Sequence, residues 1–277
     1  IANIVQLAAA KLVWRKCVVM APQSIGPIKS RFWVGILGCL LRKLDRVYVR
    51  DEYSFRFCKD KLKLESRMLC KVPDLVLTDR SLRRFKAVSG SIKVVGITVV
   101  GWGFYGNNLA RRRYLEALRC MADDLLRSGV RVIIIPQTMD MGQITDGGMA
   151  REALAGLAVE YLPQPTTLDS FLSYFDCIDL LIGSRLHSCL LALARGVPVI
   201  SISYLPKCEE ILNEIGLSEY VVDINTGDWD ELKRLYNSLS SAESRLACLN
   251  HYQSYVSRVG HRFAMDLTGI MCKTKPT

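Results

Sequence analysis

The sequence predicts an α/β protein in which parallel β-sheets are covered by helices and the chain forms two units. The first observation is that short β-branched runs alternate with helical patterns from residue 92 onward. The second is the length of 277 residues, which is enough to bury one large core or two modest ones. The third is a joint of small residues, Ser89–Ser91. We expect domains at residues 1–90 and 91–240, followed by a helical segment, residues 241–277, that reaches back across both.

The second domain shows this alternation most regularly. It opens with the β-rich run Ile92–Val100, and a loop rich in Gly and Asn separates this run from a helical pattern that stops at Gly129. The later strands are expected at 130–135, 159–162, 179–183, 197–203 and 220–222, and the helices at 110–128, 149–158, 168–175, 188–194, 207–215 and from 228. Repeated strand–helix–strand units imply a parallel sheet.

The first domain repeats the same style with fewer elements. Its expected strands are 16–20, 46–49 and 72–77, and its expected helices are 30–43 and 52–61. Three strands make a thin sheet for an independent domain. Because the sequence also opens at Ile1 rather than at a methionine, we expect the first elements of this lobe to be missing.

The charge of the chain is concentrated in the first domain. The chain carries 37 Lys and Arg against 27 Asp and Glu, and its net charge is +10. Residues 1–90 hold 19 of the basic and 7 of the acidic residues, whereas residues 91–277 hold 18 and 20. This asymmetry suggests an anion-facing lobe joined to a neutral one. We expect no nucleic-acid partner, because the basic part lacks the interleaved aromatic residues of a base-stacking platform.

Cysteine usage and apolar runs indicate the compartment. The ten cysteines are scattered without a CxxC pair, and only three histidines are present, so we expect buried, reduced thiols and no metal site. The first residues lack a secretory signal, which favours a cytoplasmic location. The run Phe32–Leu41 is too short to span a bilayer. It is either a buried helix or, with its basic flanks, a helix lying on the anionic inner face of a membrane.

Candidate site residues follow the expected strands directly. In an open parallel sheet the ligand binds at the carboxyl ends of the strands. The apolar run Leu180–Gly183 leads into Arg185 and His187, and a helix begins at once. A guanidinium suits a carboxylate or a phosphate, an imidazole moves protons near neutral pH, and a helix N-terminus adds backbone donors. The alternative is an arginine held by a neighbouring carboxylate and a histidine satisfied by the backbone.

Three further strand ends add groups to the same edge. Gly26 allows close backbone approach to a ligand, although Gly-Pro is also an ordinary turn. Arg50 is a candidate second anion clamp, and Asp51 is a candidate cap for the following helix. Lys207 begins a helix, where it either binds an anion or is solvated. The glycines of residues 101–106 lack the spacing of a nucleotide-binding loop.

An ordered series of motifs resembles the polysaccharide pyruvyltransferase family, which includes bacterial exopolysaccharide and cell-wall pyruvyltransferases. The motifs are PQSIGP (22–27), VRDEYS (49–54), VPDLVL (72–77), IPQTMD (135–140) and IGSRLHSCLLALARGVPVISISYLPK (182–207). The resemblance covers about residues 13–215, and its strongest part is the RLH segment with the following ARGVP and Y-x-x-K. The Gly-rich segment with which members of the family begin has no match here.

The resemblance implies two Rossmann-like lobes, as in GT-B glycosyltransferases, and transfer of a pyruvyl group from phosphoenolpyruvate to a pair of sugar hydroxyls as a ketal. Arg185 and His187 match the family's Arg-Leu-His, which resembles the donor site, and our hypothesis is that His187 is the catalytic general acid and base. The substrate-binding residues are then expected to be Arg185, Arg50, Ser184, Lys207, Gln23, Ser24 and Gly26. We expect no cofactor, because phosphoenolpyruvate is the donor substrate and this chemistry needs no metal.

Several interpretations stay open at this stage. The acceptor sugar is either free or lipid-linked, and the second case agrees with contact between the basic lobe and an anionic membrane. A nucleotide-sugar glycosyltransferase of GT-B type shares the lobes and the phosphate site at a helix N-terminus. A truncated, non-catalytic interaction module is the alternative outside the enzymes.

Overall fold

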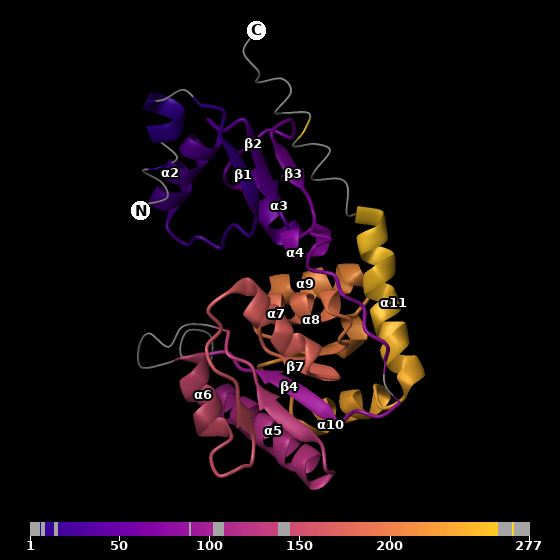
Figure 1. Ribbon diagram of the computed structural model, residues 1–277. Coiled ribbons are helices and arrows are strands. Elements are labelled where there is room, and N and C mark those ends of the chain that lie inside the picture. Colours follow the sequence, from indigo (N-terminus) through magenta and orange to yellow (C-terminus); the bar gives the residue numbers. More distant parts are fainter. Residues whose placement is uncertain are drawn as a thin grey trace. The chain divides into compact units, whose positions relative to one another are not determined.

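The computed structural model describes residues 9–13, 16–88, 90–101, 108–137 and 145–259, together with the single positions 6 and 268. Its contacts divide the chain into two units. Unit 1 comprises residues 1–78 and 256–277, and unit 2 comprises residues 79–255. Each unit contains a sheet of parallel strands (Figure 1). The domain boundaries expected at residues 90 and 240 remain sequence predictions.

Unit 2 is built around a six-stranded parallel sheet, and its strand order is β6-β5-β4-β7-β8-β9. The strands are β4 (Val94–Thr98), β5 (Arg131–Ile134), β6 (Glu160–Tyr161), β7 (Leu180–Gly183), β8 (Val199–Ser203) and β9 (Val221–Asp223). The order reverses between β4 and β7, where Thr98 pairs with Gly183. A ligand crevice in such a sheet forms at this reversal, outside the carboxyl ends of the strands.

Helices cover both faces of this sheet. They are α5 (Asn108–Arg127), α6 (Asp146–Ala153), α7 (Leu168–Asp176), α8 (Leu186–Ala194), α9 (Pro206–Ile215), α10 (Trp229–Ser238) and α11 (Ala242–Val259), and a 3-10 turn, η3 (Ser218–Tyr220), precedes β9. Figure 1 shows α7, α8 and α9 on one side of β4 and β7, and α5 and α10 on the other. Every residue of β7 and β8 is buried, as expected for strands that are covered on both faces.

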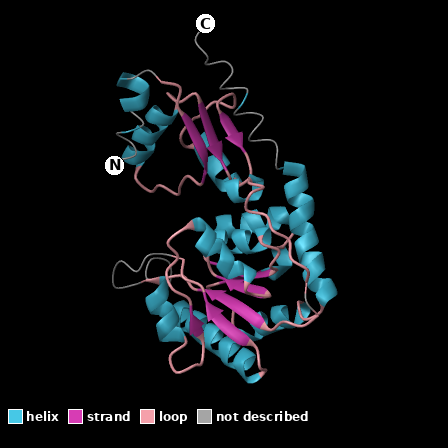
Figure 2. Cartoon of the chain, in the orientation of Figure 1, coloured by secondary structure: helices cyan, strands magenta, loops and turns pink. Residues whose placement is uncertain are grey.

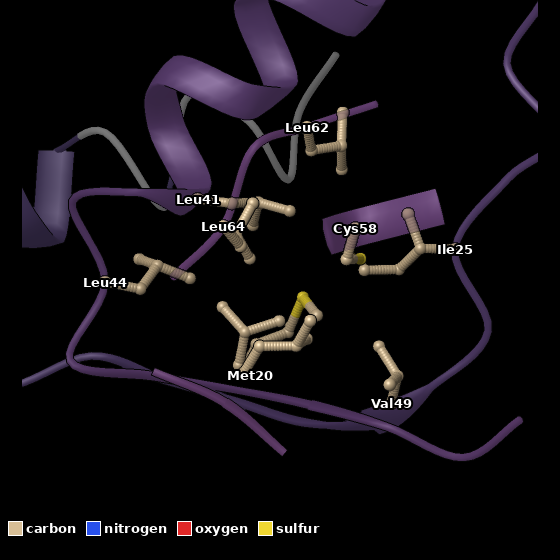
Figure 3. Close-up of a cluster of buried hydrophobic side chains, with 10 residues drawn as sticks. Met20, Ile25, Leu41, Leu44, Val49, Cys58, Leu62 and Leu64 are labelled. Carbon is tan, nitrogen blue, oxygen red and sulfur yellow. The ribbon is translucent and has the colours of Figure 1, made fainter. Parts of the chain in front are cut away.

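Unit 1 is smaller and has a three-stranded parallel sheet of order β1-β2-β3 among the described residues. Its elements are η1 (Ala9–Val13), β1 (Val19–Gln23), α2 (Arg31–Leu41), β2 (Arg46–Val49), α3 (Glu52–Asp60), β3 (Leu69–Lys71) and α4 (Leu75–Thr78). Figure 2 shows its strands and helices in the same view. Its core joins β1 and β2 to α2 and α3 through Met20, Val49, Leu41 and Cys58, with Ile25, Leu44, Leu62 and Leu64 around them (Figure 3).

The strand expected over residues 72–77 is wrong. The strand ends at Lys71, and Leu75–Thr78 forms the short helix α4. Pro73 cannot donate to a strand ladder, and the Asp74 carboxylate accepts from the Val76 amide at 3.0 Å. The Leu77 amide bonds to the Asp74 carbonyl at 2.9 Å, which closes a helical turn. An aspartate after a proline therefore starts a helix where the apolar run suggested a strand.

Helix α2, which forms over the run Phe32–Leu41, is buried at some positions and exposed at others. Gly38 and Leu41 are buried, whereas Phe32 and Trp33 at its start are 68% and 43% exposed. The two exposed rings make an edge-to-face pair with centroids 5.5 Å apart. One part of the helix therefore belongs to the core, and its first turn presents aromatic surface. Within the described part of the chain, no helix is both long and apolar enough to cross a membrane.

The nine described cysteines are free thiols, as the spacing predicts. Cys58, Cys189, Cys208 and Cys248 are buried, whereas Cys17, Cys39, Cys120 and Cys177 are exposed, so burial holds for only some of them. Burial raises the pKa of Cys58, Cys189 and Cys248 to about 12 each, which keeps these thiols protonated at neutral pH.

Candidate functional site

The predicted site residues fall into two groups, one at the carboxyl edge of each sheet. Ser184, Arg185 and His187 follow β7 at the reversal of strand order in unit 2, and Lys207 lies in the first turn of α9, after β8. Gln23, Ser24 and Gly26 end or follow β1 in unit 1, and Arg50 follows β2. The structure thus brings together four residues in unit 2 and four in unit 1, and each group is described by itself.

Arg185 is held by a carboxylate, as the alternative interpretation of this arginine expects, although the sequence analysis did not identify Asp146 as the partner. Its Nη2 donates to Asp146 Oδ1 at 2.7 Å and its Nε donates to Oδ2 at 3.0 Å, so the pair is bidentate. The two side chains are 26% and 7% exposed. Burial alone lowers the pKa of Arg185, but the hydrogen bonds and the charge of Asp146 outweigh it and raise the pKa. The guanidinium is therefore fixed in place, while about a quarter of the side chain's surface stays accessible.

The helix after Arg185 begins without a side-chain cap. Arg185 occupies the N-cap position of α8, and no side chain bonds to the first turn from that position. Helix α9 also begins without a side-chain cap, but Pro206 has no N–H and the Cys208 amide donates to the Leu205 carbonyl at 2.9 Å, so its first turn keeps fewer backbone donors than that of α8. Uncapped first turns keep backbone donors and the positive end of the helix dipole, which together bind anions. Two such helix starts follow the neighbouring strands β7 and β8.

Glycine and serine residues let α8 approach the sheet closely. A Cβ on Gly183 would lie 2.6 Å from Cys189 Sγ, which no ordinary contact allows, so glycine is required at the end of β7. The Ser188 hydroxyl donates to the Arg185 carbonyl at 2.6 Å and lies 2.9 Å from Thr98 Oγ1. The first turn of α8 is therefore tied to the strand on either side of the reversal.

The remaining residues in unit 2 differ in accessibility. His187 is exposed in the first turn of α8, and Lys207 is half-buried in the first turn of α9. The ring of Tyr204 lies 5.8 Å from Arg185 Cζ, within the range of a cation–π contact. This set offers a fixed guanidinium, an ammonium, an imidazole and two helix N-termini at one sheet edge, which suits a ligand with two anionic groups.

The Ser184 side chain is buried and bonds to another buried side chain. It is only 1% exposed, and its hydroxyl accepts from the Tyr114 hydroxyl at 2.8 Å. Tyr114 in turn accepts from the Val100 amide at 3.1 Å, and burial raises the pKa of its phenol so that it keeps its proton. The Ser184 side chain therefore lies in an internal hydrogen-bond network, and its contact with a substrate stays a prediction.

Two of the predicted unit 1 residues, Arg50 and Ser24, belong to one hydrogen-bond network. Arg50 Nε donates to Ser24 Oγ at 3.1 Å, and its Nη1 pairs with Asp74. The Ser24 hydroxyl donates to Asp51 at 2.6 Å, and Asp51 caps α3 by accepting from the Ser54 amide at 2.7 Å. Arg50 is 15% exposed, less than Arg185. Asp51 thus caps the helix as predicted, and the candidate anion clamp Arg50 is paired with the Asp74 carboxylate.

The backbone conformation at position 26 explains why this residue is a glycine. Its φ is +88°, a conformation that favours glycine, and a Cβ there would press on the Phe57 ring at 3.2 Å. The turn alone therefore accounts for glycine at this position. Gln23 is exposed at the end of β1. Of the motif IPQTMD, Thr138, Met139 and Asp140 lie outside the described residues, as does most of the glycine loop that begins at 101.

The carboxylates of Asp74 and Asp146 hold the two arginines, and the sequence signals for these two residues differ. Asp74 stands in the motif VPDLVL and could have been selected from it. Asp146 lies in the first turn of α6, which begins three residues before the helix expected at Met149. Thr145 caps this helix by accepting from the Gly148 amide at 2.9 Å. A Thr-Asp pair at a helix start is a recognisable cap signal, but nothing in it indicates the partner Arg185, 39 residues away.

The parallel sheets and the reversal of strand order are those of the GT-B glycosyltransferase fold. Anabaena HepE in complex with UDP matches 96% of this chain and 76% of its own, with 13% identity and a TM-score of 0.63. A UDP-forming trehalose-phosphate synthase from Burkholderia vietnamiensis matches 97% and 70%, with 12% identity and a TM-score of 0.60. This chain spans only 46% of the matched chain in a Streptococcus pneumoniae accessory secretory protein structure, with 13% identity, 88% of this chain covered and a TM-score of 0.55.

The chain belongs to the polysaccharide pyruvyl transferase family, whose model matches residues 3–206. This match includes both groups of predicted residues except Lys207, which lies one position beyond it. The comparison with curated proteins finds no significant match to the sequence. The family is that of a transferase, and the fold agrees with the one that the motifs imply.

Proposed function

We propose that the protein transfers a pyruvyl group from phosphoenolpyruvate to two hydroxyls of a sugar, in a polysaccharide or its precursor, and forms a pyruvate ketal. The observation that supports this proposal most directly is the Arg185–Asp146 pair at the uncapped start of α8, inside the family's Arg-Leu-His segment. It combines a fixed cation, a helix N-terminus and an exposed imidazole at one sheet edge.

The donor explains why several cationic groups are needed. Phosphoenolpyruvate carries a phosphate and a carboxylate on three carbons, so its site needs two clamps a few ångströms apart. In our proposal Arg185 binds one anionic group, and Lys207 with the start of α9 binds the other. Both lie in unit 2, after the adjacent strands β7 and β8. Arg50, Gln23, Ser24 and Gly26 stay predicted substrate contacts of unit 1.

The reaction then needs one group that moves protons. His187 gives a proton to the methylene carbon of phosphoenolpyruvate, which turns the double bond into an oxocarbenium-like centre at C2. A sugar hydroxyl attacks C2, forms the first C–O bond and gives its proton to the now neutral His187. Phosphate leaves C2 with the electron pair of its C–O bond, the second hydroxyl forms the second C–O bond at C2, and the departing phosphate takes up the proton that this hydroxyl loses. One phosphoenolpyruvate and one diol yield one ketal and one phosphate, and backbone donors at the start of α8 stabilise the anion.

A thermal-shift comparison of phosphoenolpyruvate with UDP tests the proposal. At about 100 times its Kd, a ligand that binds only the folded chain stabilises it by about 2.7 kcal/mol. For a domain of this size that raises Tm by roughly 5 to 10 °C. We expect phosphoenolpyruvate to produce this shift and UDP to produce none.

Two other outcomes contradict the proposal. A shift with UDP and none with phosphoenolpyruvate would indicate a nucleotide-sugar glycosyltransferase, consistent with the UDP that HepE binds. No shift with either ligand would favour a non-catalytic module. Pyruvate and inorganic phosphate serve as matched controls, because each carries only one of the two anionic groups of the donor.

A further inference from the structure

A hollow lies at the carboxyl edge of the unit 2 sheet, beside the Arg185–Asp146 pair. It has a volume of about 290 Å³ and lies between the ends of β5 and β6 and the first two turns of α6. Of the described residues in the motifs quoted from the sequence, only Ile135 and Pro136, the first two of IPQTMD, line it, and none of the predicted catalytic or substrate-binding residues does. Its volume is close to the lower end of the range for small-molecule sites, so it has room for a single ring or two.

The walls of this hollow are apolar and its rim is aromatic. Val99, Ile134 and Ile135 are buried and form part of its lining. Tyr161 on β6 is 41% exposed at the rim. The guanidinium of Arg151 lies 6.0 Å from the centre of the Tyr161 ring, within the range of a cation–π contact. A ring with an apolar face can therefore lie against this surface while polar groups reach its edge.

The polar groups at the hollow offer both donors and acceptors. Arg151 supplies donors, Gln164 supplies a donor and an acceptor, and Asp146 supplies a carboxylate. The same carboxylate holds Arg185, and its Oδ1 also accepts from the Gly101 amide at 2.6 Å. Asp146 therefore both lines the hollow and binds the guanidinium of Arg185. Its negative charge is already paired, so it does not repel a ligand by charge.

We propose that this hollow binds a sugar ring of the acceptor. A pyranose has apolar C–H faces and a rim of hydroxyls, each of which both donates and accepts, and it matches an aromatic rim with mixed polar groups. A ring bound beside Asp146 lies next to Arg185, where the hydroxyl pair has to meet the donor. This inference rests on the proposed function, because it assigns the acceptor of that same reaction.

Binding of simple glycosides tests the inference without requiring turnover. Saturation-transfer NMR on the whole chain, with methyl glycosides of glucose, galactose, mannose and N-acetylglucosamine, is expected to show binding of at least one. We expect Tyr161→Ala to weaken that binding at least tenfold and Gln164→Ala to weaken it by a smaller factor. Tyr161→Phe keeps the ring and is expected to keep the affinity, which separates loss of the aromatic face from loss of the fold.

The control is Tyr53→Ala, because Tyr53 is also 41% exposed but lies on α3 of unit 1. The inference is overturned if no glycoside binds, if Tyr161→Ala leaves the affinity unchanged, or if Tyr53→Ala removes it instead. It is also overturned if uridine displaces the glycoside, because the hollow would then be a nucleoside site. Phosphoenolpyruvate shifts measured on the same variants should stay unchanged. If phosphoenolpyruvate does not shift the Tm of the unsubstituted chain, that result counts against the proposed function, whatever the glycosides do.

Discussion

Each unit places an arginine within two residues of the end of a parallel strand and pairs it with an aspartate, yet the two arrangements differ in what they leave for a ligand. Arg50 after β2 pairs with Asp74, and Arg185 after β7 pairs with Asp146. In unit 1 the next residue, Asp51, closes the start of the following helix. In unit 2 the arginine itself occupies that position and α8 has no side-chain cap. The same local plan therefore stabilises a fold in one unit and leaves anion-binding capacity in the other.

The residue two positions after each arginine sharpens this difference. In unit 1 it is Glu52, whose carboxylate accepts from Arg56 at 3.0 Å and from Lys71 at 3.3 Å. The hydrogen bond from Arg56, together with Lys71, lowers the pKa of Glu52, so it stays ionised. In unit 2 the residue is His187, and an imidazole is the side chain most often used as a general acid or base. Proton transfer is thus expected in unit 2.

The largest expected effect concerns this histidine. His187→Ala should lower turnover by roughly 10²- to 10⁴-fold while phosphoenolpyruvate affinity changes little, because a general acid acts on the transition state. The measurement is phosphate release from phosphoenolpyruvate with the methyl glycoside that binds best. Glu52→Ala is the matched change in unit 1 and should leave turnover near its original value. Near-original turnover in His187→Ala would show that another group moves the proton.

The next effect separates the two arginines by donor affinity. Because removing one partner leaves a buried charge, each pair is neutralised together, as Arg185→Gln with Asp146→Asn and as Arg50→Gln with Asp74→Asn. The first double variant should weaken phosphoenolpyruvate binding about 100-fold, since a charge-assisted contact of this kind contributes about 2.7 kcal/mol. The second should weaken it less than about threefold. Isothermal calorimetry with phosphoenolpyruvate measures both, and equal losses would mean that the two units bind the donor together.

This difference between the units was only partly predictable from the sequence. Strands such as Arg46–Val49 and helices such as Pro206–Ile215 follow from local periodicity and caps, and both were predicted within a residue. The strand expected over 72–77 was not found, because the cap formed by Asp74 outweighed its apolar neighbours. Arg185 was selected because it follows a strand, whereas Asp146 was missed. Which carboxylate meets which arginine is decided by tertiary packing, and no local pattern encodes it.

A smaller effect tests whether Asp51 acts only on unit 1. Asp51 is fully buried, and Asp51→Ala removes the cap of α3 and leaves Ser24 without its acceptor. Loss of such a cap costs about 1 to 2 kcal/mol, which raises the population of locally opened unit 1 by roughly 5- to 30-fold. Cys58 lies in the unit 1 core, so its labelling by a thiol reagent at neutral pH should accelerate by that factor.

The buried thiols of unit 2 are the internal control for this experiment. Burial raises the pKa of Cys58, Cys189 and Cys248 alike, to about 12, so all three react only when their surroundings open. Mass spectrometry of labelled peptides should show unchanged rates at Cys189 and Cys248. Acceleration at all three sites would mean that the units unfold as one body, which would contradict the independence of the two cores.

The smallest expected effect concerns the exposed start of α2. We propose that Phe32 and Trp33, with the exposed Lys29 and Arg31 beside them, contact an anionic membrane surface. Aromatic rings insert at the headgroup level, and each lysine or arginine near an anionic surface adds about 1 kcal/mol. Phe32→Ser with Trp33→Ser should therefore reduce binding to phosphatidylglycerol-containing vesicles by about three- to tenfold in a sedimentation assay.

The control variant for this prediction changes two exposed apolar side chains of unit 2. Leu109→Ser with Leu168→Ser removes two unit 2 side chains that are 58% and 57% exposed, similar in apolar surface but without the basic excess of unit 1. This variant should bind vesicles as the unsubstituted chain does, and neither variant should bind pure phosphatidylcholine. If both variants lose binding equally, membrane affinity follows from exposed apolar surface alone. If only the α2 variant does, the charge of unit 1 positions that unit at the membrane, while donor chemistry stays in unit 2.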